Sequence, residues 1–262
     1  MSIQPKTRTL QALEYIQGYC GPTNPEHLMY ISWLRDAEKL LSSDRYAAYT
    51  LQGFAHLLMG NIDAALESMQ SAYQIKSDGD ATQNYINTLH KAGCFLQSNE
   101  ISLQSLHRNP YLTGVVPMVI YNSINLLDGD PIIQAVDLYQ GSEARDYLLD
   151  NSRLALEEIE FRISLLDRLG IGKEAFIKTM QLLQRFLSKH YAGYNEFIVA
   201  GEETEFEDVL RIRMFLSGVN IDDALDLNDL FIDELVESDT LEYDEYKKIL
   251  VSFIPVQQGA GV

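Results

Sequence analysis

Apolar residues recur every three or four positions over most of this chain, and this helical spacing constrains its fold more than any other feature. The spacing runs from Leu10 to about Gly193 in short stripes, each of which ends at a group of turn-forming residues. Three stripes are followed by a glycine, Gly60, Gly93 or Gly129, at separations of 33 and 36 residues. A single pair of short helices cannot cover its own apolar face, so successive pairs must stack. The sequence therefore predicts a mainly α fold, an array of antiparallel helical hairpins.

One of these pairs, residues 46–78, has small residues where its two helices would touch, a glycine turn between them and a bulky residue in the second helix: Gly53, Gly60, Ala65, Met69 and Ala72. With these residues the segment resembles a tetratricopeptide repeat. Residues 11–44 and 79–140 resemble the same repeat more weakly. In the second of these segments the pattern has alanine, an aromatic residue and alanine where this chain has Ser98, Ser102 and Ser105.

Stacked hairpins are slightly rotated relative to one another, so an array of this kind curves and forms a concave groove. In the first helix of the next unit, the helical phase predicts that four polar side chains line that groove: Gln83, Asn87, His90 and Lys91. These side chains could hydrogen-bond an extended or helical peptide. The alternative is that they form the solvated face that every amphipathic helix has.

Two longer helices are predicted after the hairpins, from Glu143 to Leu169 and from Lys173 to about Tyr191, and they would cap the array or lead to a second unit. After residue 192 the period changes. Short β-prone runs at 197–199 and 210–216 indicate a strand hairpin, which a helix over 221–236 and a strand over 248–255 follow. We therefore expect a helical-repeat domain with long capping helices over 1–192 and a small acidic α+β domain over 193–262.

Negative charge is the unusual feature of the composition, because 38 Asp and Glu residues against 20 Lys and Arg residues give a net charge of −18. Such a chain is repelled by nucleic acid and by anionic lipid and attracts basic surfaces, so we expect neither nucleic acid nor membrane as a partner. Five carboxylates are spaced three or four residues apart on the C-terminal helix, which places them on one side of it: Asp222, Asp226, Asp229, Asp233 and Glu237. They form either a surface for a basic partner or a face that only keeps the protein soluble.

The chain contains none of the glycine-rich phosphate loops, nucleophile motifs or histidine-rich metal motifs that mark common enzyme classes. We therefore expect no catalytic residues, no metal and no cofactor. Cys20 and Cys94 fit no metal or disulfide spacing, which favours a reducing, cytoplasmic setting. No export signal and no membrane-spanning run is recognisable in the sequence.

These observations favour a non-enzymatic cytosolic interaction protein of bacterial type. It would act as an adaptor, regulator or neutraliser that binds a basic protein partner with its groove and its acidic C-terminal surface. Two other classes remain open. The carboxylates Asp222, Asp226 and Asp229 could serve a metal-dependent hydrolase, or the acidic stripe could mimic the phosphates of nucleic acid.

Overall fold

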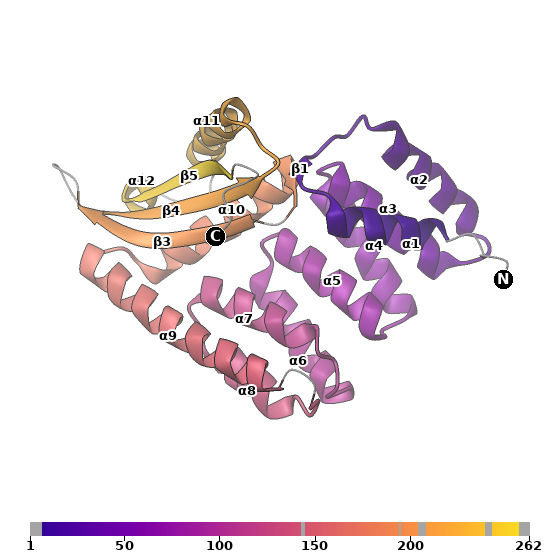
Figure 1. Ribbon diagram of the computed structural model, residues 1–262, viewed down its shortest axis with the longest axis horizontal. Coiled ribbons are helices and arrows are strands. Elements are labelled where there is room, and N and C mark those ends of the chain that lie inside the picture. The colour runs from indigo at the N-terminus through magenta and orange to yellow at the C-terminus, as the bar shows by residue number, and fades with distance from the viewer. Residues whose placement is uncertain (1–6, 143–144, 194, 204–207, 239–242, 257–262) are drawn as a thin grey trace.

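The structure is a computed structural model that describes residues 7–142, 145–193, 195–203, 208–238 and 243–256. Helices occupy most of this part of the chain, and a small sheet lies near the C-terminus (Figure 1). The predicted fold class, mainly α with a small α+β unit at the end, is confirmed.

Three antiparallel hairpins form the middle of the molecule. Their helices are α3 (Arg45–Leu58) with α4 (Ile62–Ile75), α5 (Gly79–Lys91) with α6 (Phe95–Arg108), and α7 (Val115–Leu126) with α8 (Asp130–Leu138). Aspartates begin two of these helices, because the Asp44 carboxylate accepts the backbone N–H of Ala47 and the Asp78 carboxylate accepts that of Ala81. Before the hairpins, α1 (Arg8–Gly18) and α2 (Leu28–Leu40) both pack on α3.

The first hairpin is held together at the positions that the sequence singled out. A Cβ atom on Gly53 would lie only 2.6 Å from the terminal methyl carbon of Met69, so a larger residue there would force the Met69 side chain to move. Ala65 and Ala72 are both buried in the same hairpin. Small residues therefore allow the two helices to approach closely, as the spacing predicted.

Each hairpin turns at a residue with a left-handed backbone conformation. The residues are Gly60 (φ 77°), Gly93 (φ 75°) and Leu127 (φ 53°), so the turns are separated by 33 and 34 residues. Gly129, which the sequence placed between two helices, lies two residues after the left-handed Leu127. Gly129 has φ −83° and immediately precedes α8 as its N-cap residue.

Two long helices follow, and they have different roles. Helix α9 (Arg145–Leu169) packs against α7 and α8 at the end of the array. Helix α10 (Lys173–His190) crosses the hairpin turns instead. A Cβ atom on Gly60 would be too close to the Lys189 carbonyl oxygen, and one on Gly93 would lie 2.5 Å from the Gln181 carbonyl oxygen. The turn glycines are thus required both by their conformation and by the contact with α10.

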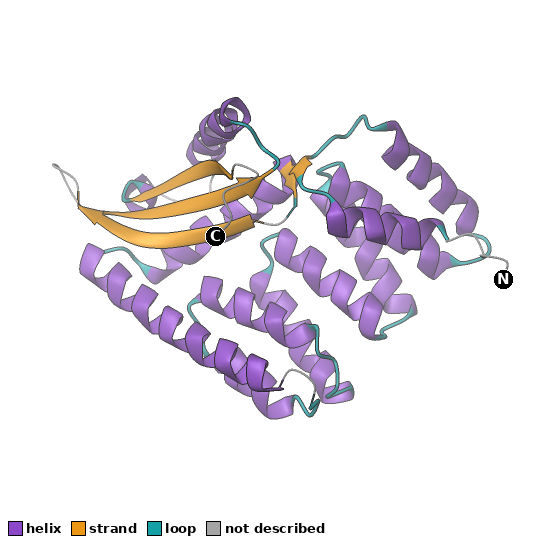
Figure 2. Ribbon diagram, in the orientation of Figure 1, coloured by secondary structure: helices purple, strands orange, loops and turns teal. Residues whose placement is uncertain are grey.

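The sheet contains β3 (Asn195–Glu203), β4 (Asp208–Ser217) and β5 (Ile249–Val256) in the order β3-β4-β5 (Figure 2). β3 is antiparallel to β4, whereas β5 is parallel to β4 and is reached through α11 (Ile221–Glu237) and the short α12 (Tyr243–Tyr246). The alternation predicted in β4 is present, because Leu210, Ile212, Met214 and Leu216 are buried. A second, two-stranded ladder pairs β1 (Gly21–Pro22) with β2 (Tyr191–Ala192) and ties the N-terminal segment to the end of α10.

The largest hydrophobic core joins the two predicted units. It contains Leu165 of α9, Phe186 of α10, Ile212 of β4 and Phe231 of α11. The core therefore extends across residue 192, where the sequence placed a domain boundary. Within the described residues, no helix has both the length and the apolar character needed to cross a membrane.

Candidate functional site

The four polar residues predicted to line the groove do not form one open surface. Gln83 is exposed, and its amide lies beside Gly114 at the start of α7. Asn87, His90 and Lys91 are partly buried. Burial lowers the pKa of Lys91, and it lowers the pKa of His90 to about 4, so His90 is neutral at physiological pH.

His90 belongs to a hydrogen-bonded seam between the second and third hairpins. Its Nδ1 atom lies 2.8 Å from Oδ1 of Asn122, and Nδ2 of Asn122 donates to Oγ of Ser98 at 2.8 Å. The Ser98 hydroxyl donates in turn to the backbone carbonyl of Ile86 at 3.0 Å. Ser98 thus satisfies polar groups that are buried between the helices.

An apolar cleft of about 590 Å³ opens one hairpin further along, between α7 and α9. Its most exposed aromatic side chains are Tyr121 (51% exposed), Tyr147 (66%) and Phe161 (54%). The other lining residues are mostly apolar: Pro117, Ile120, Ile124, Leu148, Asn151, Leu154, Ala155, Glu157 and Glu158. A cleft with several large exposed apolar side chains is typical of an interaction site rather than of ordinary surface.

The cleft occupies the same phase of the repeat as the predicted groove. A shift of 34 residues, the separation of the turns at Gly93 and Leu127, carries Gln83, Asn87 and His90 onto Pro117, Tyr121 and Ile124. All three of these α7 residues line the cleft. These α7 residues were not predicted, because the groove positions were read from the preceding hairpin alone. The same helical phase one hairpin later points to them.

Helix α9 provides the other wall and has two neighbouring stripes. Leu148, Ala155 and Arg162, spaced by seven residues, are buried against the rest of the molecule. Tyr147, Leu154 and Phe161, each one residue earlier, are more than half exposed. A seven-residue repeat returns to nearly the same side of a helix after two turns, so these three side chains form a row along the cleft.

Buried Arg162 holds α9 in place beside this row. Its Nε atom donates to the carboxylate of Glu158 at 2.7 Å, and its guanidinium carbon lies 5.1 Å from the ring centre of Phe197 and 5.9 Å from that of Phe176. Burial lowers the pKa of the Arg162 guanidinium, and the ion pair with Glu158 opposes that effect. One wall of the cleft is therefore fixed to β3 and α10 by a charged and aromatic cluster.

The acidic stripe predicted on the C-terminal helix is present on α11. Asp222, Asp226, Asp229, Asp233 and Glu237 are all exposed. Neither an ion pair nor a hydrogen bond to a basic side chain involves any of these five side chains in the part of the chain that the structure describes. The only α11 carboxylate in an ion pair there is Glu234, whose partner Lys189 lies on α10 at 3.3 Å.

A metal centre does not emerge from these residues. Among the described residues, no group of three or more His, Cys, Asp or Glu side chains is arranged to hold a metal ion. Asp222 and Asp229 are seven positions apart, which corresponds to about 10 Å along a helix. Asp222, Asp226 and Asp229 therefore gain no support from the structure as a hydrolase centre.

Comparison with known proteins identifies no relative, because no family model, no curated protein and no solved structure matches this chain.

Proposed function

We propose that this protein is a non-enzymatic interaction protein of the tetratricopeptide-like type, and that it holds a segment of a protein partner in the cleft between α7 and α9. The observation that carries this proposal is the row of half-exposed aromatic and aliphatic side chains in a cleft at the groove positions of the repeat. A folded protein gains by covering such a surface, since each Å² of apolar area removed from water contributes about 25 cal/mol.

The charge of the molecule supports a basic partner. The net charge is −18. The two carboxylates that line the cleft, Glu157 and Glu158, pair with Arg153 and Arg162 of the same helix, so the attraction for a basic partner comes from the overall charge of the chain. Complementary charge would speed association and select the partner, while the apolar wall would contribute most of the affinity. The free cysteines Cys20 and Cys94 support an adaptor or regulator of the cytoplasm.

Affinity capture from the native cell tests this proposal. The tagged full chain is compared with the double variant Tyr121→Ser/Phe161→Ser, which removes one aromatic side chain from each wall of the cleft. Leu96→Ser is the matched control, because Leu96 is also a large apolar residue, 59% exposed, but lies on α6 and does not line the cleft. We expect proteins that copurify with the unmodified chain and with Leu96→Ser to be lost from the double variant.

Recovery of the same proteins with all three chains would contradict the proposal. Point variants are preferable to deletion of residues 194–262, because the strands share a core with α9 and α10 and their removal would expose it. Unchanged circular dichroism and thermal melting would show that the variants are folded.

A further inference from the structure

Helix α11 has four aliphatic side chains on its solvent side that no described part of the chain covers. They are Ile221 (63% exposed), Leu225 (57%), Ile232 (55%) and Val236 (63%). The same helix buries a separate set, Ala224, Leu227, Phe231 and Leu235, against α10, β5 and the sheet core. α11 is therefore apolar on two sides, although packing in its own fold requires only one.

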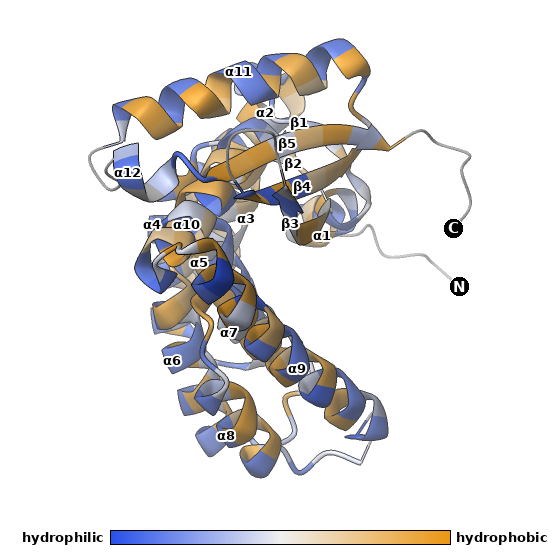
Figure 3. Ribbon diagram, turned by 90° about the vertical axis from the view of Figure 1, so that its left-hand side faces the viewer, coloured by the Kyte–Doolittle hydropathy of each residue, from blue (hydrophilic) through white to orange (hydrophobic). Residues whose placement is uncertain are grey.

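The four exposed residues form one continuous strip. Their spacing of four, seven and four residues confines them to an arc of about 60° on the helix, given 100° per residue. Figure 3 shows hydrophobic segments recurring along α11, which runs across the top of the molecule at its edge. We call Ile221, Leu225, Ile232 and Val236 the aliphatic strip.

On the surface of α11 the aliphatic strip lies next to Asn228, which contacts β5. The Asn228 side chain accepts the backbone N–H of Phe253 at 3.0 Å and donates to the backbone carbonyl of Ala224 at 2.8 Å. Asn228 thereby occupies a backbone group on the outer edge of β5. A partner at the strip therefore cannot simply continue the sheet as a fourth strand beside Phe253, and it must pack against α11 through side chains.

Acidic residues border the strip along its whole length. A carboxylate follows each aliphatic residue directly, at Asp222, Asp226, Asp233 and Glu237, and Asp229 fills the gap in the middle. No Lys or Arg occurs anywhere between residues 221 and 237. Like charges three or four residues apart destabilise a helix by a few tenths of a kcal/mol per pair, so an approaching cation would stabilise α11.

A face that served only solubility would be polar throughout, and it would not include four aliphatic residues that are more than half exposed. We propose that the aliphatic strip is a docking surface, distinct from the α7–α9 cleft, for an amphipathic α-helix of a partner protein that has Lys or Arg residues beside its apolar face. The apolar faces of the two helices pack together, and the basic residues pair with the carboxylates that border the strip, as flanking charges do in helix pairs.

The charge also argues against a second copy of this chain as the occupant. Two copies of α11 placed face to face would bring their carboxylates together without a single basic residue on either helix. A basic helix, in contrast, could pair its positive charges with the carboxylates along all 17 residues of α11.

A peptide selection tests this proposal with the full-length protein. The probe is a displayed library of random 18-residue peptides, selected on the unmodified chain and counter-selected on the double variant Leu225→Gln/Ile232→Gln. The best peptides are then synthesised with a fluorescent label, and their affinity is measured by anisotropy at low and high salt. Leu230→Gln is the matched control, because Leu230 is 46% exposed on the same helix but lies outside the strip.

We expect the selected peptides to have apolar residues at helical spacing and a net positive charge. Leu225→Gln/Ile232→Gln should weaken their binding at least tenfold, whereas Leu230→Gln should change it less than twofold. Asp226→Asn/Asp233→Asn should weaken binding at low salt and reduce its dependence on salt.

Several outcomes would overturn the proposal. One is that no peptide survives counter-selection, and another is that the survivors lack helical periodicity or positive charge. A third is that scrambled peptides of the same composition bind equally well, which would mean that charge alone attracts them. Sedimentation showing a dimer of this chain that Leu225→Gln/Ile232→Gln dissociates would identify a second copy as the occupant instead.

Discussion

The second hairpin (α5–α6) and the third (α7–α8) have the same architecture and opposite chemistry. Their turns, at Gly93 and Leu127, are 34 residues apart and both are left-handed. At equivalent groove positions, however, α5 has Asn87 and His90, whereas α7 has Tyr121 and Ile124. One helix face is polar and partly closed, and the other lines an open apolar cleft.

This difference shows that helical phase and neighbouring elements have separate effects on a groove position. The phase of the helix decides which positions face the groove, and it is the same in both hairpins. Neighbouring elements decide whether those positions are open to a partner. On α5, His90 is hydrogen-bonded to Asn122, which in turn binds Ser98. On α7, Tyr121 lines the cleft that separates α7 from α9. A repeat position is therefore not a site until its neighbours are known.

The largest expected effect is on stability and concerns the turn of the second hairpin. Gly93→Ala places a Cβ in a left-handed residue and 2.5 Å from the Gln181 carbonyl oxygen. The left-handed conformation costs roughly 1–2 kcal/mol, and the steric conflict with α10 adds roughly 1–3 kcal/mol. Denaturant unfolding should show both losses.

Gly170→Ala is the control for that measurement, because Gly170 is also left-handed (φ 63°) but a Cβ there would approach only Nζ of Lys248, at 3.9 Å. It should show the conformational loss alone. Equal losses in the two variants would mean that α10 does not constrain the turns of the array.

The second prediction concerns the seam that closes the second hairpin. Burial lowers the pKa of His90 from 6.5 to about 4, so between these pH values the unfolded chain binds more protons at this residue than the folded chain does. The contribution of neutral His90 is therefore fully present above pH 6.5 and is lost as the pH falls toward 4. The loss should reach up to about 3 kcal/mol.

Unfolding of the unmodified chain and of His90→Gln across this pH range checks the prediction. The variant should have a flatter pH dependence, whereas His107→Gln, at an exposed histidine of α6, should retain the original slope. Parallel curves for all three proteins would show that burial does not keep His90 neutral in the folded chain.

The smallest effect is expected at the groove face of α5 itself. Asn87→Ala should change the affinity for any partner captured through the α7–α9 cleft by less than twofold, because Asn87 is not among the cleft residues. Titration of a captured partner by calorimetry measures this. A tenfold loss would extend the binding site from α7 onto α5 and would remove the functional contrast between the two hairpins.

The sequence predicted the fold more fully than the site. Periodicity located the hairpins, the strands and α11, and Gly53 with Met69 identified one helix contact in detail. It did not identify Leu127 as the left-handed residue of the third turn, because a leucine in that conformation has no signal in composition. It also divided the chain at residue 192, although α9 and α10 share a core with the sheet.

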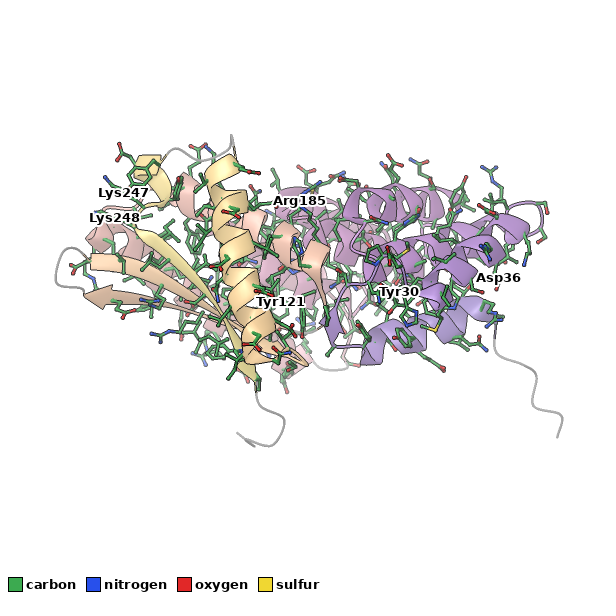
Figure 4. All side chains as sticks on the ribbon, turned by 90° about the horizontal axis from the view of Figure 1, so that it is seen from above. Tyr30, Asp36, Tyr121, Arg185, Lys247 and Lys248 are labelled. Carbon is green, nitrogen blue, oxygen red and sulfur yellow. The ribbon has the colours of Figure 1, made fainter. Side chains whose placement is uncertain are left out.

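Local chemistry is sufficient for the elements whose formation depends on neighbours in the chain. Helix period, capping aspartates, turn glycines and the carboxylates of α11 are all properties of short segments, so this sequence by itself determined them. Contacts between distant segments are not properties of short segments, so the sequence pattern does not reveal them. Only the tertiary structure placed α10 across the hairpin turns. Arg185 of α10, labelled in Figure 4, pairs there with Asp63 of α4 at 2.8 Å. It alone also opened the cleft beside Tyr121 and left the aliphatic strip of α11 uncovered, because side chains become buried or exposed only when separate elements pack.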